Sequence, residues 1–443
     1  MRATMKTLRQ VVVFALALAP LTLVQAFEDS TVAAWVQYTA AGVEARAVVK
    51  GDCPSIRINR QPVAMKLRAD VTGDHPNRVC AAVLPERVRS LELQGQALPV
   101  PVENPQRIVI VGDTGCRLSD DHGLYQECDN DAIWPFQYVA QSVADYRPDL
   151  ILYTGDYIYR EDACPEGNSG CEASPYGDNE TTWRADWMDP ARPMQLAAPM
   201  ILVRGNHEIC SRAGTGWFRY MDAFAHSDIC VDNTPAWSVS LDKLDIGVID
   251  SGRVKDEDDQ ELTELFAAQL QELKPRLGRN AWIATHRPFW GFGADDDSGE
   301  LITPTGTLQD AVDAVGLPQG TNLLVSAHIH LAEVIGFQGD RPPQMVVANG
   351  GTQLVPRVDP PEEIDGVAID VGLVLYQYGF VSMESGAADR QWRAGFRDLE
   401  GRELEVCQLD SRRVSCRETR SPLSQWFGPG RFTGPGGGAG AAD

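Results

Sequence analysis

Five short segments carry side chains of the types that bind metal ions. They read GDTG at residues 112–115, GDYIY at 155–159, GNHE at 205–208, THRP at 285–288 and AHIH at 327–330. Together they hold four of the seven histidines, with aspartates, an asparagine and tyrosines. Oxygen and imidazole ligands suit hard and borderline cations. We therefore expect the five segments to form one metal site from distant parts of the chain.

The segments lie where predicted β-strands end. Apolar runs typical of buried strands occur at 108–111, 150–154, 200–203, 246–249, 282–285 and 323–326. Helical spacing of apolar residues predicts helices at 136–143 and 259–273. Open α/β sheets bind ligands just beyond the carboxyl ends of their strands. A small residue at that point lets the next side chain project into a shared cleft, which predicts an α/β core built around the site.

Changes in sequence pattern divide the chain after residue 26 into four parts. Short β-rich runs predict an N-terminal β domain over residues 27–105, followed by a catalytic core over 106–374 and a β-rich segment over 375–427. Residues 428–443 form a Gly-rich tail that is too poor in apolar groups to fold. Within the core, residues 160–198 lack a clear core element, which predicts a surface insertion that shapes access to the site.

The first residues predict export. Arg2, Lys6 and Arg9 precede an apolar run at 11–24, and a small-residue cleavage pattern follows, so residues 1–26 are interpreted as a signal peptide. The alternative is a membrane anchor, but the run is shorter than the roughly 20 residues that a spanning helix needs. We expect a secreted or periplasmic protein without stable membrane insertion.

Ten cysteines are consistent with an oxidising compartment. Pairing of sequence neighbours would join Cys53 to Cys80, Cys116 to Cys128, Cys164 to Cys171, Cys210 to Cys230 and Cys407 to Cys416. Spacing alone does not determine connectivity, and a zinc site is the alternative, although the chain has no Cys-x-x-Cys. The formal net charge of −23 argues against nucleic acid and anionic membranes as partners.

The five segments resemble the motifs of the calcineurin-like metallophosphoesterase superfamily, and within it those of the purple acid phosphatases. The resemblance covers residues 107–351 and includes an Asn-Gly-Gly segment at 349–351. Its most specific element is Tyr159, three residues after Asp156, because the wider superfamily lacks a tyrosine ligand. The implied fold is α/β, a metallophosphoesterase-type two-sheet α/β sandwich with an N-terminal β domain.

The resemblance also implies a ligand set for two metal ions. The first ion would be bound by Asp113, Tyr159 and His330, the second by Asn206, His286 and His328, with Asp156 bridging the two. In the purple acid phosphatases the first ion is ferric iron and the second is Fe, Zn or Mn. For Tyr159 the alternative is core packing, with its hydroxyl bonded to the backbone.

The catalytic expectations follow from the same motifs. His207 and Asp156 are the predicted catalytic residues, and Asn206, His207 and Arg287 are predicted to bind the phosphoryl group. Glu208 is expected to orient His207. For Arg287 the alternative is a structural ion pair.

Two departures from the purple acid phosphatase pattern stand out. Ala327 replaces the usual glycine, which a tight turn tolerates if the backbone is not left-handed there. The segment at 289–297 lacks the second histidine of many plant-type members. In that segment Trp290 and Phe292 are either a wall for the substrate or anchors of the loop. The acidic run at 295–297 is typical of a solvated loop.

We expect a metal-dependent phosphoric ester hydrolase that cleaves phosphate monoesters through a metal-activated hydroxide. Its partner would be a small phosphorylated substrate, while the sequence sets no oligomeric state. The alternative within the same class is a phosphodiesterase or nucleotidase, a choice that the loops at 160–198 and 289–300 would decide. The alternative of another class is a non-catalytic metal-binding or adhesion module.

Overall fold

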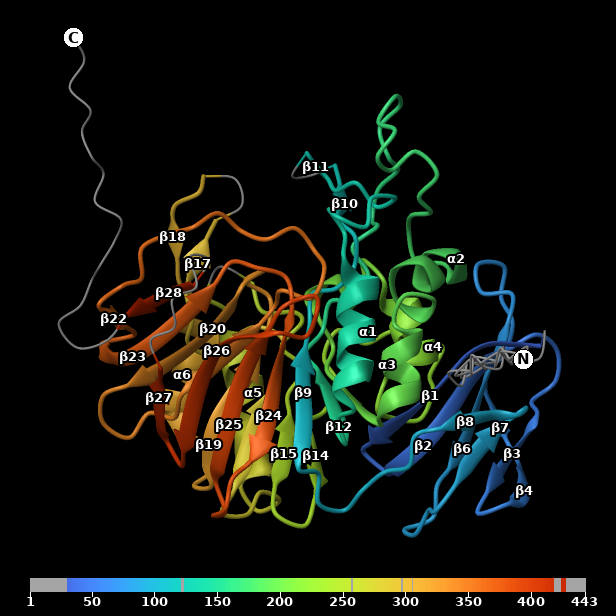
Figure 1. Ribbon diagram of the computed structural model, residues 1–443, viewed down its shortest axis with the longest axis horizontal. Helices are drawn as coiled ribbons and strands as arrows, with labels where there is room; N and C mark the ends of the chain where they lie inside the picture. Colours follow the sequence, from blue (N-terminus) through green and yellow to red (C-terminus); the bar gives the residue numbers. More distant parts are fainter. Residues whose placement is uncertain are drawn as a thin grey trace, which may run out of the picture.

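Two large β-sheets packed face to face form the centre of the computed structural model (Figure 1). The structure describes residues 30–417 except 121–122, 256–257, 296–297 and 305, together with the strand at 424–427. The predicted signal peptide at 1–26 and the Gly-rich tail at 428–443 lie outside the described residues, as does most of the acidic run at 295–297.

The first sheet has eleven strands drawn from three parts of the chain. Their order is β27 (Arg413–Cys416), β26 (Glu403–Asp410), β25 (Gln391–Arg397), β24 (Phe380–Ser385), β9 (Arg107–Val111), β12 (Leu150–Tyr153), β13 (Met200–Leu202), β1 (Thr31–Thr39), β2 (Gly42–Val49), β6 (Arg78–Val83) and β5 (Lys66–Ala69). Strands β9, β12 and β13 are parallel, so their carboxyl ends lie at the same edge of the sheet.

The second sheet has nine strands. Their order is β14 (Trp237–Ser240), β15 (Asp245–Val248), β16 (Ala281–Ala284), β19 (Thr321–Ser326), β21 (Gln344–Val347), β20 (Ala332–Phe337), β23 (Val367–Leu375) and β22 (Glu363–Ile364), with β28 (Ser424–Phe427) also paired to β23. Strands β15, β16, β19 and β21 are parallel. The two sheets with their helices confirm the predicted two-sheet α/β fold.

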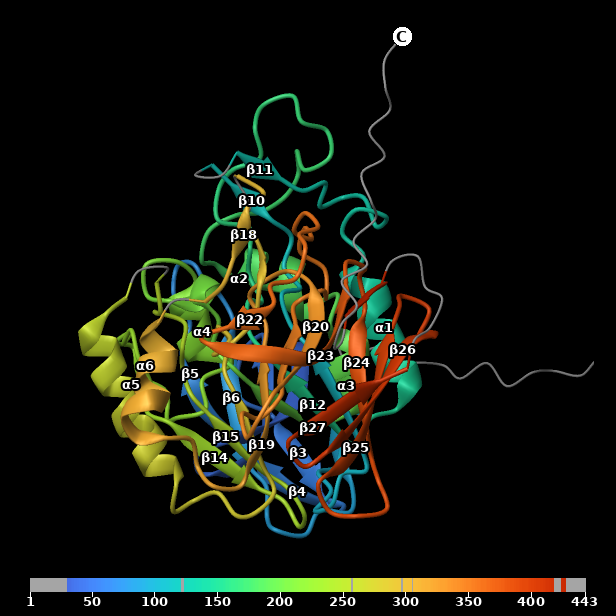
Figure 2. The ribbon, with the colours of Figure 1, turned by 90° about the vertical axis from the view of Figure 1, so that its left-hand side faces the viewer.

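Helices cover the outer faces of the two sheets (Figures 1 and 2). The helices are α1 (Phe136–Tyr146), α2 (Glu180–Trp183), α3 (Arg192–Ala197), α4 (Gly214–Tyr220), α5 (Gln260–Leu273) and α6 (Gly306–Val315), with a π-helical segment (Arg184–Met188) after α2 and a 3-10 turn (Asn206–Glu208) after β13. Buried residues of α1, α3 and α4 pack on the first sheet, and those of α5 and α6 pack on the second.

Three small sheets complete the fold. A four-stranded sheet has the order β4 (Gln61–Ala64), β3 (Ser55–Ile58), β7 (Leu91–Leu93) and β8 (Gln96–Leu98). Two hairpins, β10 (Leu118–Ser119) with β11 (Leu124–Tyr125) and β17 (Gly293–Ala294) with β18 (Leu301–Ile302), rise on the same side of the molecule (Figures 1 and 2).

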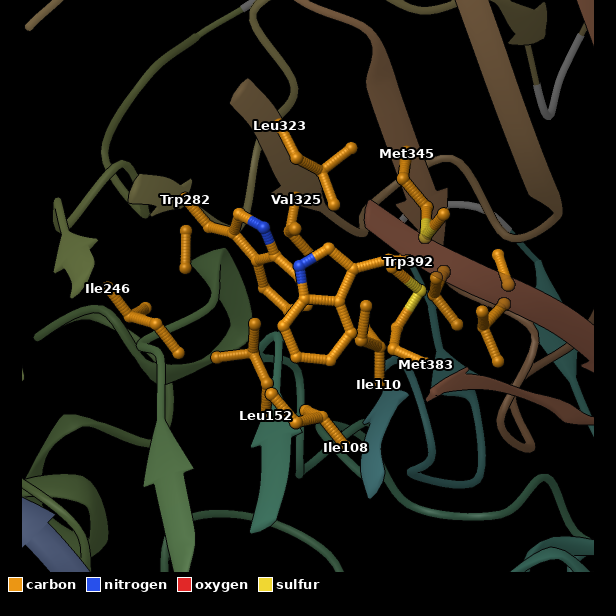
Figure 3. Close-up of a cluster of buried hydrophobic side chains, with 14 of the residues drawn as sticks. Ile108, Ile110, Leu152, Ile246, Trp282, Leu323, Val325, Met345, Met383 and Trp392 are labelled. Carbon is orange, nitrogen blue, oxygen red and sulfur yellow. The ribbon is translucent and has the colours of Figure 1, made fainter. Parts of the chain in front are cut away.

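A large apolar cluster fills the space between the two sheets (Figure 3). Because successive side chains of a strand point to opposite faces, Ile108 and Ile110 of β9 enter this cluster, while Val109 and Val111 pack under the helices. At its centre Trp282 of β16 meets Trp392 of β25 edge to face, with ring centroids 4.9 Å apart. The two tryptophans join the sheets directly.

The N-terminal β region is continuous with the core. Strand β1 pairs in parallel with β13, with Gln37 opposite Met200, so that β1, β2, β6 and β5 extend the first sheet. At the other end β24 pairs with β9, which joins the predicted C-terminal β segment to the same sheet. The N-terminal β region predicted from the sequence is thus present, but most of it does not form a separate sheet.

The prediction of a surface insertion at 160–198 is wrong for its second half. Trp183, Trp187 and Met194 are fully buried and pack on the first sheet. These side chains have helical spacing, but prolines at 190 and 193 argued against a helix. In the structure Pro193 lies in the first turn of α3, where proline is compatible with a helix. Only the residues before α2 form an extended loop.

All five predicted disulfides form between sequence neighbours: Cys53–Cys80, Cys116–Cys128, Cys164–Cys171, Cys210–Cys230 and Cys407–Cys416. The zinc alternative for these cysteines is therefore wrong. Among the described residues, no helix is long and apolar enough to cross a membrane.

The tryptophan pair between the sheets yields a test of the fold. We expect Trp282→Ala to lower the free energy of unfolding by about 3–5 kcal/mol, because it leaves a cavity at the centre of the cluster. Denaturant unfolding would measure the change as a lower midpoint at unchanged slope. Tyr176→Ala, at a ring that is 53% exposed, is the control and should change stability little. Equal midpoints for the two variants would contradict the central role of the pair.

Candidate metal centre and active site

All seven predicted metal ligands meet at one end of the two sheets. Asp113 follows β9, Asp156 and Tyr159 follow β12, and Asn206 follows β13, all in the first sheet. His286 follows β16, and His328 and His330 follow β19, in the second sheet. The site therefore straddles the two sheets, at the strand ends where the sequence placed it.

The backbone turns sharply at four of these positions. Asp113, Asp156, His328 and His330 have φ angles of 52°, 56°, 79° and 49°. Positive φ is uncommon for residues other than glycine, and such strained residues cluster at functional sites. Ala327 does not have a positive φ angle. The turn at this position therefore tolerates alanine in place of the usual glycine.

Two glycines let the loops approach each other. A Cβ atom on Gly155 would lie 2.5 Å from His286 Nδ1, and one on Gly205 would overlap Asp156 Oδ1. Gly155 also has a φ of 108°, which side chains rarely allow. These contacts explain why glycine opens the second and third motifs.

The Tyr159 hydroxyl lies at the centre of the first group of ligands. Its oxygen is 2.7 Å from Asp113 Oδ1, 2.7 Å from Asp156 Oδ2 and 2.9 Å from His330 Nε2. The side chain is fully buried. The alternative in which this hydroxyl bonds only to the backbone is therefore wrong.

The second group of ligands surrounds His286. Its Nε2 is 2.9 Å from Asn206 Oδ1 and 3.1 Å from Asp156 Oδ2. Its Nδ1 is 2.9 Å from the carbonyl oxygen of Thr154, the kind of second contact that fixes the orientation of a ligating imidazole. Asp156 Oδ2 thus touches both groups, as a bridging carboxylate would.

The residues present fit a pair of cations. Asp156, His286 and His328 offer ligand atoms that all lie within 4.8 Å of one another. His328 Nδ1 is buried and has no hydrogen-bond partner among the described residues, so it is available to a ligand. Two carboxylates, a phenol and imidazoles are donors that suit iron, zinc or manganese.

Comparison with known proteins identifies the family. The family model described as calcineurin-like phosphoesterase matches residues 106–332, which is just over half of the chain. This chain belongs to the calcineurin-like phosphoesterase family. Membership of this family indicates that the protein is a hydrolase that acts on phosphoesters. No curated protein matches the sequence.

One solved structure supports the fold, and a second is less similar. A purple acid phosphatase from yellow lupin (Lupinus luteus) seeds superposes with a TM-score of 0.55 at 13% sequence identity, covering 86% of this chain and 74% of that one. The structure of PhoD gives a TM-score of 0.48 at 11% identity, covering 88% of this chain and 92% of that one. At these identities the lupin enzyme shows a shared fold.

Burial and neighbouring charges shift the pKa values of several acidic groups in the site of this calcineurin-like phosphoesterase. Burial raises the pKa of Asp113 to about 7. Burial also acts to raise the pKa of Asp156, but the charges of His286 and His207 hold it well below its usual value. Burial and the carboxylates of Asp113 and Asp156 raise the pKa of the Tyr159 hydroxyl. A cation among these oxygens would favour their ionised forms instead.

The expectation that Glu208 orients His207 is wrong. The buried Glu208 carboxylate accepts hydrogen bonds from the backbone N–H groups of Asp156, Tyr157, Ile158 and Gly205, at 2.8–3.2 Å. It therefore ties the loop after β12 to the loop after β13. Burial and the charge of Asp156 raise the pKa of Glu208 to about 8.

His207 is instead paired with Glu161, which the sequence did not single out. His207 Nδ1 lies 3.0 Å from Glu161 Oε1, and Arg212 Nε lies 2.7 Å from the same oxygen. His207 Nε2 faces the metal ligands, 3.9 Å from Asp156 Oδ2. Glu161 stands only two residues after Tyr159, but no spacing rule connects it to His207.

Other predicted residues fall into two groups. Arg287 lies beside the proposed ligands. Burial lowers the pKa of His328, and the charge of Arg287 lowers it further. Trp290 and Phe292 are buried in the apolar cluster under α5 and α6, and Trp290 Nε1 donates to Asp365, so both are loop anchors. His75, outside the motifs, is buried, and its Nδ1 contacts the Tyr220 hydroxyl.

The Glu208 contacts predict a loss of stability and of metal. We expect Glu208→Gln to lower the free energy of unfolding by about 2–4 kcal/mol, because the amide cannot accept all the buried N–H groups that the carboxylate satisfies. Metal content of the purified protein should fall with it. Glu172→Gln, at an exposed carboxylate, is the matched control. A Glu208→Gln protein with unchanged stability and metal content would contradict this role.

Proposed function

We propose that this calcineurin-like phosphoesterase is an exported dinuclear-metal enzyme that hydrolyses phosphate monoesters, as an acid phosphatase does. The observation that carries the proposal is the buried Tyr159 hydroxyl within 2.9 Å of Asp113, Asp156 and His330. A tyrosine in this position matches the ligand pattern of the purple acid phosphatases. The five disulfides support export, because such bonds persist in oxidising compartments.

Each residue of the site receives a role in the proposal. Asp113, Tyr159 and His330 would hold one ion, Asn206, His286 and His328 would hold the other, and Asp156 would contribute to both. When bound, the ions would supply a hydroxide nucleophile near neutral pH and positive charge for the phosphoryl oxygens. A phenolate oxygen favours ferric iron at the first position, with Fe, Zn or Mn at the second.

The chain's own groups then complete the reaction. Arg287 and Asn206 would orient the phosphoryl group between the two sheets. His207 Nε2 faces the same space and would give a proton to the leaving oxygen. Glu161, on the other side of the ring, holds His207 Nδ1 and so fixes which nitrogen faces the substrate.

Metal analysis with a visible spectrum tests the proposal first. We expect two metal equivalents per chain, including iron, and a broad tyrosinate-to-iron absorption band. Tyr159→Phe should remove the band because it removes the phenolate. Two equivalents of zinc or manganese without colour would contradict the iron assignment while keeping the hydrolase.

An Asp156→Asn variant with full activity would contradict the shared-carboxylate mechanism.

The contact between Glu161 and His207 predicts a selective loss of turnover. We expect Glu161→Gln to lower kcat about 10–100-fold, because His207 loses the partner that orients it. KM and metal content should change little. The ion pairs of Glu161 among the described residues are with His207 and Arg212, and neither of these is a proposed metal ligand. Steady-state kinetics with metal analysis would separate the two effects, with Glu172→Gln as the control. A proportional loss of metal and of kcat would instead show that Glu161 is structural.

A further inference from the structure

A small apolar pocket opens beside the proposed metal centre. Its walls include Val254, Ile302, Leu308 and Ile329, and His328 and Arg287 also line it. The cavity volume is about 40 Å³. A cavity needs about 10–15 Å³ of the same measure to hold one water molecule, so this pocket holds a group of about three or four atoms.

The pocket shares a residue with the metal centre. His328 forms part of its lining and also offers a ligand atom within 4.8 Å of those of Asp156 and His286. A phosphoryl group held at the centre would therefore place one of its substituents next to the pocket. Because most of the walls are aliphatic, a substituent entering there gains by leaving water.

A hairpin adds exposed apolar surface at the same place. Leu301 and Ile302 of β18 are both 44% exposed, and Ile302 also lines the pocket. The hairpin β17–β18 rises on the same side of the molecule as β10–β11 (Figures 1 and 2). Ile302 thus contributes partly exposed apolar surface to the pocket, which an apolar ligand would remove from water. The hairpin also carries Asp295 and Glu300 next to these residues, which would repel an anionic substituent.

We propose that this pocket binds the leaving group, and that the substrates are phosphate monoesters of small apolar alcohols. The proposal rests on the function proposed above. In the reaction the bond from phosphorus to the alkoxide oxygen breaks and a bond from phosphorus to the oxygen of water forms. The leaving oxygen takes up a proton, so that the products are the apolar alcohol and inorganic phosphate.

A series of n-alkyl phosphates tests the pocket. The leaving alcohols from ethanol to hexanol have closely similar acidity, so chain length changes binding and leaves the chemistry nearly constant. We expect kcat/KM to rise about fourfold for each added methylene group until the pocket is full, after about three or four carbons. Calorimetry with n-alkylphosphonates, whose carbon–phosphorus bond is not cleaved, should show the same dependence in Kd.

Two neighbouring variants provide a matched comparison. Ile302→Ser should flatten the dependence on chain length, because it replaces part of the pocket wall. Leu301→Ser changes an equally exposed residue of the same strand that does not line the pocket, and should leave the dependence intact. If both variants behave alike, the pocket does not select the leaving group.

The outcomes separate this inference from the function on which it rests. Hydrolysis of the alkyl phosphates at one common kcat/KM, together with one common Kd for the phosphonates, would overturn the pocket and keep the phosphatase. Failure of the metal-loaded protein to hydrolyse p-nitrophenyl phosphate or any alkyl phosphate would overturn the phosphatase itself. In that case a chain-length dependence of phosphonate binding would still count for the pocket as an apolar subsite.

Discussion

The buried carboxylate of Glu208 is the contact on which the geometry of the site depends. It accepts four backbone N–H groups and so fixes the turn after β12 against the turn after β13. Those two turns carry the proposed bridging ligand Asp156 and the ligand Asn206. A carboxylate can do this because two oxygens present several acceptor positions, whereas a backbone carbonyl has only one oxygen. The left-handed backbone at Asp156 persists because its surroundings hold it from several sides.

Local features of the fold follow from the sequence, whereas contacts between loops do not. Buried strands and the long helices were predicted correctly, because their apolar patterns are local. The positions of the proposed ligands followed from short motifs at strand ends, and the structure brings these residues together. Glu161 and the true role of Glu208 were missed because their partners are set by how loops pack, which no local pattern encodes. The second half of 160–198 was misread because its prolines outweighed a helical spacing of tryptophans.

That misread segment contributes directly to the site. Asp186, in the π-helical segment, accepts hydrogen bonds from the backbone N–H groups of Tyr159 and Cys116, and its side chain pairs with Arg160. Burial raises the pKa of Asp186, against the charge of Arg160. The buried tryptophans on either side of Asp186 anchor the segment on the first sheet. A region that looks like an insertion is therefore part of the frame that positions the proposed tyrosine ligand.

The site also depends on how the two sheets are held together. One set of proposed ligands follows strands of the first sheet, and the three proposed histidine ligands follow strands of the second. The distance between the two sets is therefore fixed by the apolar cluster between the sheets, in which Trp282 and Trp392 are in direct contact. Among the residues that line the pocket, Arg287, Pro288, His328 and Ile329 belong to the ligand motifs and so connect the pocket to this frame. Since Val254, Ile302 and Leu308 lie outside the ligand motifs, these walls can change without moving the proposed metal ligands, so the proposed selectivity for the leaving group can vary while the proposed chemistry is kept.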